Sequence, residues 1–170
     1  TGQSNGLDDA DIDAPEAWNV ANSAAGVVVA IIDSGVRTTH QDLAANMWVN
    51  SGEIPNNGVD DDGNGYIDDV HGISAVDGSG DPSDDNGHGT HVAGTVGAVG
   101  NNGLGSTGVA WQVQLMALKF LAANGEGDVF AAIECIDYAI DNGADIINNS
   151  WGNPGFSQAL IGAVERSRQA

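Results

Sequence analysis

The sequence is poor in cysteine, in basic residues and in long apolar runs. Its only cysteine among 170 residues is Cys135, so no disulfide can form within the chain. Lysine and arginine together number 4, against 24 aspartates and glutamates, for a formal net charge of −20. Because nucleic-acid binding needs cationic side chains at the phosphates, we expect no nucleic-acid partner. No apolar run reaches the roughly 18 residues that a membrane-spanning helix needs, so we expect no membrane partner.

The net charge and the first 20 residues each leave more than one interpretation open. The acidic excess fits simple solubility, and it also fits cation binding or a salty habitat. Residues 1–20 show neither a basic start nor an apolar middle, which fits a mature secreted chain or a cytosolic one. Cys135 lies in an apolar helical pattern, so we interpret it as a buried, inert thiol rather than a reactive one.

Apolar runs alternate with helical patterns along the chain. Strands are predicted at residues 26–32, 113–120 and 144–148, and helices at residues 14–20, 88–99, 128–142 and 158–168. Residues 50–87 are rich in Gly, Asn and Asp and are predicted to form a long loop region. The alternation predicts an α/β fold, with a three-layer, doubly wound, mostly parallel sheet and helices on both faces. No repeat or linker divides the chain, so residues 1–170 belong to one domain.

Two of the predicted helices carry clear end signals. Asp128 suits the N-cap of the first, Gly143 suits the position after its last turn, and Ser157 suits the N-cap of the second. The apolar positions expected to face the core are Val129, Ile133, Ile136 and Ile140 in the first helix, and Leu160, Ala163 and Val164 in the second.

Polar and glycine-rich segments follow the predicted strands at Asp33, at residues 120–127 and at residues 150–152. Because active sites of such sheets lie beyond the carboxyl ends of the strands, the topology gathers these segments at one edge.

Asp33 ends a buried strand, where an ionised carboxylate needs donors or a cation. His88 lies between two glycines at a helix start, with bare backbone around it. An ionised Asp bonded to one imidazole nitrogen fixes the tautomer and stabilises the imidazolium.

Two motifs resemble the subtilisin family, and the resemblance extends over nearly all of the chain. They are VVAIIDSGV at residues 28–36 and NGHGTHVAGT at residues 86–95. The resemblance implies a subtilisin-like fold and a secreted serine endopeptidase with an Asp-His-Ser acyl-enzyme mechanism. It assigns Asp33 the orienting role, His88 the role of general base and His91 a structural role.

The same resemblance implies two edges that sandwich an extended peptide substrate. One edge is Ser150, Trp151 and Gly152, at the S1 pocket. The other contains Gly125 and Gly127, for which an ordinary turn is the alternative. Trp151 stands where the family often has leucine, so it is also open to a purely packing role.

Five carboxylates fall within ten residues between Asp60 and Asp69. A folded loop with this charge needs a cation, whereas a solvated, disordered loop tolerates it. Hard oxygen ligands favour Ca²⁺ over Zn²⁺. We therefore predict a Ca²⁺ site with the ligands Asp60, Asp62, Asn64 and Asp69; a plain acidic loop is the alternative. His71 stands where an EF-hand has its twelfth-position Glu, so a true EF-hand is not expected.

Residues 99–110 resemble the calcium loop of the family. The resemblance implies ligands from the carbonyls of Gly100, Leu104 and Ser106, the side chain of Asn102 and the carboxylate of Asp42. Gln3 is a further, N-terminal candidate.

The family's nucleophile and oxyanion asparagine lie in Gly-Thr-Ser-Met-Ala-like and Ala-Gly-Asn-like segments, and this sequence contains neither. We therefore expect residues 1–170 to be the N-terminal portion of a single catalytic domain, inactive alone. The remainder is expected on a second chain after a nick; a truncated fragment and a natural inactive homologue are the alternatives. A competing function is an inactive calcium-binding scaffold on a protease fold. A pure calcium buffer would not need the motifs at Asp33 and His88.

Overall fold

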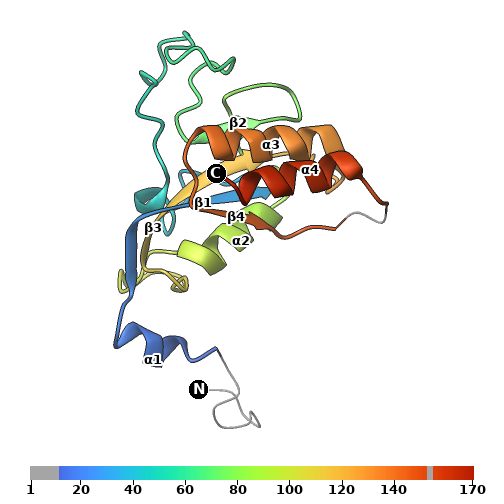
Figure 1. Cartoon of the computed structure of the whole chain (residues 1–170). Helices are drawn as coiled ribbons and strands as arrows, with labels where there is room; N and C mark the ends of the chain where they lie inside the picture. Colours follow the sequence, from blue (N-terminus) through green and yellow to red (C-terminus); the bar gives the residue numbers. More distant parts are fainter. Residues whose placement is uncertain (1–11, 153–154) are drawn as a thin grey trace.

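A parallel sheet of four strands forms the centre of the computed structural model, which describes residues 12–152 and 155–170 (Figure 1). The strands are β1 (Ser23–Asp33), β2 (Gly72–Ser74), β3 (Gln112–Lys119) and β4 (Ile146–Asn149), in the order β2-β3-β1-β4. All three strand pairings are parallel. The predicted α/β class with a parallel sheet is confirmed.

Helices cover both faces of this sheet. The helices of the described chain are α1 (Ala14–Trp18), α2 (His88–Gly97), α3 (Val129–Asp141) and α4 (Gln158–Ser167), with a short 3₁₀ turn η1 (Ala44–Asn46); α1 lies apart from the sheet (Figure 1). Figure 1 shows α3 and α4 on one face of the sheet and α2 on the other. No helix in the described part of the chain is long and apolar enough to cross a membrane.

Strand β1 is apolar along its second half because both of its faces are buried. Ala30 and Ile32 belong to the core beneath α3, whereas Val29 and Ile31 belong to the core beneath α2. A strand covered on both sides reads as a continuous apolar run instead of an alternating one. The run at residues 26–32 therefore identified this strand correctly.

Helix α3 begins and ends as predicted, and its buried face is wider than the predicted stripe, of which Ile133, Ile136 and Ile140 pack on the core. Oδ1 of Asp128 accepts from the amide of Phe130 at 2.6 Å, and Gly143 has a φ of 70°. The fully buried positions include Cys135 and Ile136, whereas Ile133 and Ile140 are only half-buried. Alanines at 132 and 139 complete the buried face, because small side chains let the helix approach the sheet closely. Burial raises the pKa of the Cys135 thiol, in keeping with an inert side chain.

Two further expectations need correction. Val164 was expected to face the core, but it is 40% exposed because it lines an open cavity together with Ile140 and Ile147. The other two predictions for α4, the cap at Ser157 and the burial of Ala163, are observed. Residues 50–87 contain strand β2, which was not predicted. A strand of three residues is too short to show an alternating pattern in the sequence. Gly72 in this strand has a φ of 129°, and a Cβ there would lie 1.8 Å from the carbonyl oxygen of Ala117.

Candidate active site

The carboxylate of Asp33, at the end of β1, contacts the imidazole of His88, at the start of α2. Nδ1 of His88 lies 2.8 Å from Oδ1 and 3.0 Å from Oδ2 of Asp33. The Asp33 side chain is fully buried, whereas that of His88 is 51% exposed. An ionised carboxylate in this position holds the proton on Nδ1, which leaves Nε2 free to accept a proton from a reactant.

Glycines allow α2 to approach the end of β1 this closely. A Cβ on Gly89 would lie 2.1 Å from the carbonyl oxygen of Gly35 and 3.1 Å from Cβ of Asp33. Gly35 itself has a φ of 98°, and a Cβ there would lie 2.4 Å from the carbonyl oxygen of Pro82. Gly35 and Gly89 are therefore a packing requirement of the contact.

Asp84, which lies outside the two motifs, joins the segments around Asp33 and His88. Its Oδ1 accepts from the Ser34 hydroxyl at 2.9 Å and from the Gly87 amide at 2.8 Å. Its Oδ2 accepts from the Thr90 amide at 3.0 Å, inside the first turn of α2. Burial opposes ionisation, but hydrogen bonds from Gly87, Thr90 and Asn86 outweigh it and lower the pKa of Asp84. An Asp just before a helix start is a recognisable capping signal.

Lys119 lies opposite Asp33 in the register of β1 and β3 and is 6% exposed. Its Nζ donates to Oδ1 of Asp85 at 2.6 Å and to the carbonyl oxygens of Ser34 and Leu121, each at 2.8 Å. The ammonium thus holds three chain segments together at the end of β1, where Ser34 follows Asp33. The only lysine of the chain, placed in a predicted buried strand, was a sequence signal for such a role.

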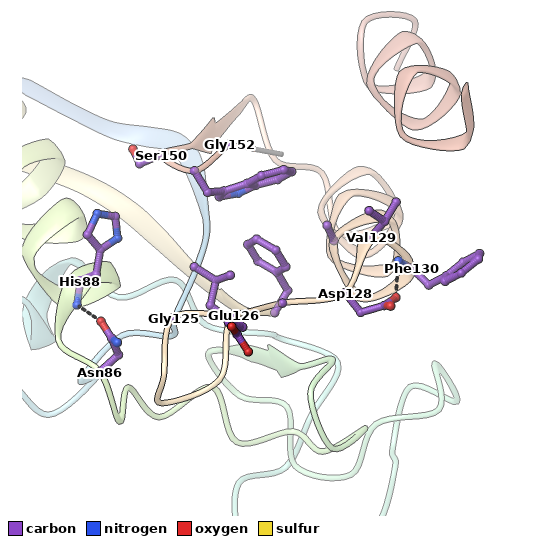
Figure 2. A pocket seen from close by; sticks show the side chains of 14 residues that line it. Asn86, His88, Gly125, Glu126, Asp128, Val129, Phe130, Ser150 and Gly152 are labelled. Atoms are coloured by element: carbon purple, nitrogen blue, oxygen red, sulfur yellow. Dashed lines mark hydrogen bonds between the residues drawn. The ribbon is translucent and has the colours of Figure 1, made fainter. Parts of the chain in front are cut away.

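A cavity of about 1000 Å³ opens beside His88, beyond the carboxyl ends of the strands. The substrate-binding candidates all line it: Gly125, Gly127, Ser150, Trp151 and Gly152. Figure 2 shows the glycine segment and the segment of Ser150 and Gly152 on opposite sides of this cavity. The structure therefore gathers the segments that follow β1, β3 and β4 at one edge of the sheet, as the topology predicted.

Trp151 both packs against the core and lines the cavity. Its ring lies 4.7 Å from that of Phe120, centroid to centroid, and its Nε1 donates to the carbonyl oxygen of Ile32 at 2.9 Å. The hydrogen bond and the ring contact fix the indole as an apolar wall of the cavity.

In the acidic loop the structure groups three carboxylates, from Glu53, Asp60 and Asp62. One oxygen of each lies within 4.8 Å of the others. A Ca²⁺ ion with Ca–O distances of about 2.4 Å fits between oxygens that far apart. Glu53 is 7% exposed and was missed, because it precedes the acidic run by seven positions.

Asn64 and Asp69, two further ligand candidates, lie in a hydrogen-bond network that includes that group. The Asn64 amide donates to Oδ1 of Asp60 and of Asp62, each at 3.1 Å, and Nδ2 of Asn50 donates to both Asp62 and Asp69. Asp69 is fully buried and accepts from the side-chain amides of Asn50 at 3.1 Å and Asn64 at 2.8 Å, and from the Tyr138 hydroxyl. Burial, followed by the bond to Asp69, raises the pKa of Tyr138. These contacts attach the acidic loop to α3.

Three of the calcium-loop candidates, Asp42, Asn102 and Ser106, are joined by hydrogen bonds. Asp42 is 5% exposed, and its carboxylate accepts from Nδ2 of Asn102 at 2.7 Å and from the Ser106 amide at 3.3 Å. Leu104 lies in the same turn, where its amide donates to Oδ1 of Asn102 at 3.0 Å, and the Gly100 amide donates to the Trp111 carbonyl oxygen at 3.4 Å. A buried carboxylate with an amide side chain beside it is a donor set that suits Ca²⁺. Gln3 lies outside the described residues.

The sequence of the chain is similar to a known protein family and to several of its members. The family model described as the subtilase family matches residues 24–170. The chain is 42% identical over 164 residues to subtilisin-like protease 1 of Plasmodium vivax, covering 96% of this chain and 26% of that protein.

Two bacterial relatives agree with this match. Subtilisin DY of Bacillus licheniformis is 39% identical over 143 residues, covering 84% of this chain and 43% of that protein. Thermitase of Thermoactinomyces vulgaris is 35% identical over 153 residues, covering 88% of this chain and 47% of that protein. The chain thus spans between about a quarter and a half of the length of these relatives. On its matched residues, its parallel sheet and its two motifs, this chain belongs to the subtilase family.

Proposed function

We propose that residues 1–170 are the N-terminal portion of a single catalytic domain of a secreted serine endopeptidase. The contact between Nδ1 of His88 and the buried carboxylate of Asp33, beside a large cavity, is the observation that carries this proposal. The nucleophilic serine and the oxyanion asparagine come from polypeptide outside this chain. The known relatives support that division, because each is more than twice as long as the matched segment.

In the proposed mechanism His88 is the general base and Asp33 orients it. Nε2 of His88 takes the proton of the serine hydroxyl as the serine oxygen attacks the peptide carbonyl carbon. The imidazolium then gives this proton to the leaving amine, and an acyl-enzyme remains. Water, activated by the same nitrogen, attacks the acyl carbon and releases the serine. Asp33 stays ionised throughout and stabilises the imidazolium.

The substrate is an extended peptide lying between two chain segments. Residues 125–127 and residues 150–152 border the cavity from opposite sides and offer backbone donors and acceptors at strand ends. An extended peptide can pair with such edges as an added strand. Phe120 and Trp151 provide an apolar surface for one of its side chains.

The exposed edge of β4 is where we place the remainder of the domain. Ile146, at the start of this edge strand, is 53% exposed. Unpaired strand edges with apolar side chains are normally covered by further structure. A second chain produced by a nick, or the continuing polypeptide, would pair there.

Calcium is the proposed cofactor at the two acidic places described above. In the first, Glu53, Asp60 and Asp62 would hold it; in the second, Asp42 and Asn102, with carbonyls of the same loop. The bound ion would neutralise like charges and fix these loops. We assign it no step in the reaction.

A fluorophosphonate probe on the complete protein tests the proposal, since it labels only an activated serine. We expect labelling outside this chain, and a loss of about 10⁴ in kcat for Asp33→Asn, the size seen for that change in a serine protease of unrelated fold. Asp141→Asn, at an exposed position, is the matched control. Absence of labelling in the complete, folded protein would favour the inactive calcium-binding scaffold instead.

A further inference from the structure

Six Asn-Gly pairs lie in the described part of this chain. They are Asn57-Gly58, Asn64-Gly65, Asn86-Gly87, Asn102-Gly103, Asn124-Gly125 and Asn142-Gly143. In such a pair the glycine nitrogen can attack the side-chain carbonyl carbon of the asparagine, because glycine has no Cβ to shield its amide. The protein therefore contains a set of chemically identical dipeptides whose surroundings can be compared.

The backbone geometry of the six pairs is nearly uniform. All six glycines have a positive φ, between 70° and 103°. In five pairs the asparagine Oδ1 also accepts from the amide two positions further on. Those amides belong to Val59, Tyr66, His88, Leu104 and Glu126. Neither the dipeptide nor this turn distinguishes one of these five pairs from another.

The acceptor of the glycine amide does distinguish the six pairs. Three of these amides donate to carboxylates, at 2.8 to 3.0 Å: those of Gly58, Gly65 and Gly87. Two donate to carbonyl oxygens, at 2.8 and 3.1 Å: those of Gly125 and Gly143. The amide of Gly103 has no acceptor among the described residues. The attacking nitrogen must lose its proton and turn toward the side-chain carbonyl carbon. A hydrogen bond from this N–H to an acceptor fixes the amide and slows the attack.

We propose that Asn102 is a site of spontaneous deamidation in this protein. A bond forms between the Gly103 nitrogen and Cγ of Asn102, the bond from Cγ to Nδ2 breaks, and ammonia leaves with the proton that Gly103 lost. Water then opens the cyclic imide to aspartate or isoaspartate. The Leu104 amide, 3.0 Å from Oδ1 of Asn102, stabilises the negative charge that develops on this oxygen.

The modification changes the surroundings of Asp42. In the unmodified chain Nδ2 of Asn102 donates to Oδ1 of Asp42 at 2.7 Å, and Asp42 is 5% exposed. The product has a carboxylate in place of that donor, so two like charges face each other at a nearly buried position. Deamidation therefore loosens residues 99–110 when no cation is present. The proposal itself does not depend on the proposed function.

Site-resolved mass spectrometry of the complete protein tests this directly. The folded protein is incubated at mildly alkaline pH with a chelator and a serine-protease inhibitor, then digested at low pH. We expect Asn102 to deamidate about tenfold or more faster than Asn57, Asn64 and Asn86, the factor that one charge-assisted hydrogen bond supplies, and about threefold or more faster than Asn124 and Asn142, where the acceptor is a neutral carbonyl oxygen. In denatured protein the rates should converge. A native rate at any of the other five equal to that at Asn102 would overturn the proposal.

A variant tests the physical cause. Asp68→Ala removes the acceptor of the Gly58 amide, so deamidation at Asn57 should rise toward the rate at Asn102, which stays unchanged. An unchanged rate at Asn57 in a folded variant would contradict the argument. Because the comparison within the unmodified protein needs no variant, poor folding of Asp68→Ala leaves the test intact. Added Ca²⁺ should slow deamidation at Asn102; an unchanged rate there would count against Asn102 as a calcium ligand, not against deamidation.

Discussion

The hydroxyl of Ser34 donates to Oδ1 of Asp84 at 2.9 Å, although 50 positions separate the two residues. Ser34 directly follows Asp33, and its Oγ also accepts from the Gly89 amide at 2.9 Å, directly after His88. The contact of Asp33 with His88 is thus supported from the side by a second bridge between the same two segments. Asp84 is the carboxylate on which this bridge depends.

Asp84→Asn tests whether the bridge positions His88. An amide side chain cannot accept from the same set of donors, so the first turn of α2 loses part of its anchoring. We expect kcat of the complete protein to fall by about 10²-fold, the size associated with a misplacement near 1 Å, with little change in KM for a short substrate. Asp141→Asn should leave both unchanged. A variant with full kcat would show that Asp84 has no positioning role.

The stability of the fold should depend on pH through Asp84. Its pKa in the folded chain lies below the ordinary value of 3.8, so folding favours its ionised form. The contribution is complete above about 3.8 and is lost as the pH falls through the lower, folded pKa. Asp77, whose pKa is lowered chiefly by a hydrogen bond from Ser74, acts in the same direction. The free energy of unfolding, measured by urea titration across acidic pH, should lose part of this slope in Asp84→Asn; an unchanged slope would contradict the assignment.

Lys119→Met should destabilise the fold far more than the comparable change at Arg168. Removing the Lys119 ammonium leaves the carbonyl oxygens of Ser34 and Leu121 without this donor, at a cost of about 2–3 kcal/mol in the free energy of unfolding. Arg168 pairs with Glu165 at 3.4 Å in an exposed position, so Arg168→Met should cost less than about 1 kcal/mol. Chemical denaturation compares the two variants, and equal losses would refute the role of the buried ammonium.

Calcium removal should lower the melting temperature, and Glu53→Gln should weaken that response. A chelator should remove about 2.7 kcal/mol of stability where Ca²⁺ had been present at 100 times its Kd. In Glu53→Gln one of the three grouped carboxylates is lost, so binding weakens and the chelator has less to remove. Glu165→Gln, at an exposed position on α4, is the matched control. Identical chelator effects in all three proteins would place the stabilising ion elsewhere.

The sequence predicted the strands and the helix ends well because each has a local cause. The apolar run at residues 26–32 reports a strand buried on both faces, and Asp128 and Ser157 cap helices through their own side chains. Strand β2 was missed because its three residues depend on pairing with β3 and carry no pattern of their own. The predicted stripe of α3 was too narrow: Ile133, Ile136 and Ile140 do pack on the core, but apolar size alone does not show that Ala132 and Ala139 leave room for the sheet.

The sequence by itself determined the parallel α/β architecture and the placement of the Asp33 and His88 motifs at strand and helix ends, since both follow from short-range patterns. Only the tertiary structure decided that Glu53 joins Asp60 and Asp62, that Tyr138 covers Asp69, and that Lys119 and Asp84 brace the site. Glu53 precedes Asp60 by 7 positions, and the pairs Ser34–Asp84, Asp69–Tyr138 and Ser34–Lys119 are 50, 69 and 85 positions apart, so only the packing of the sheet and its loops brings these residues together.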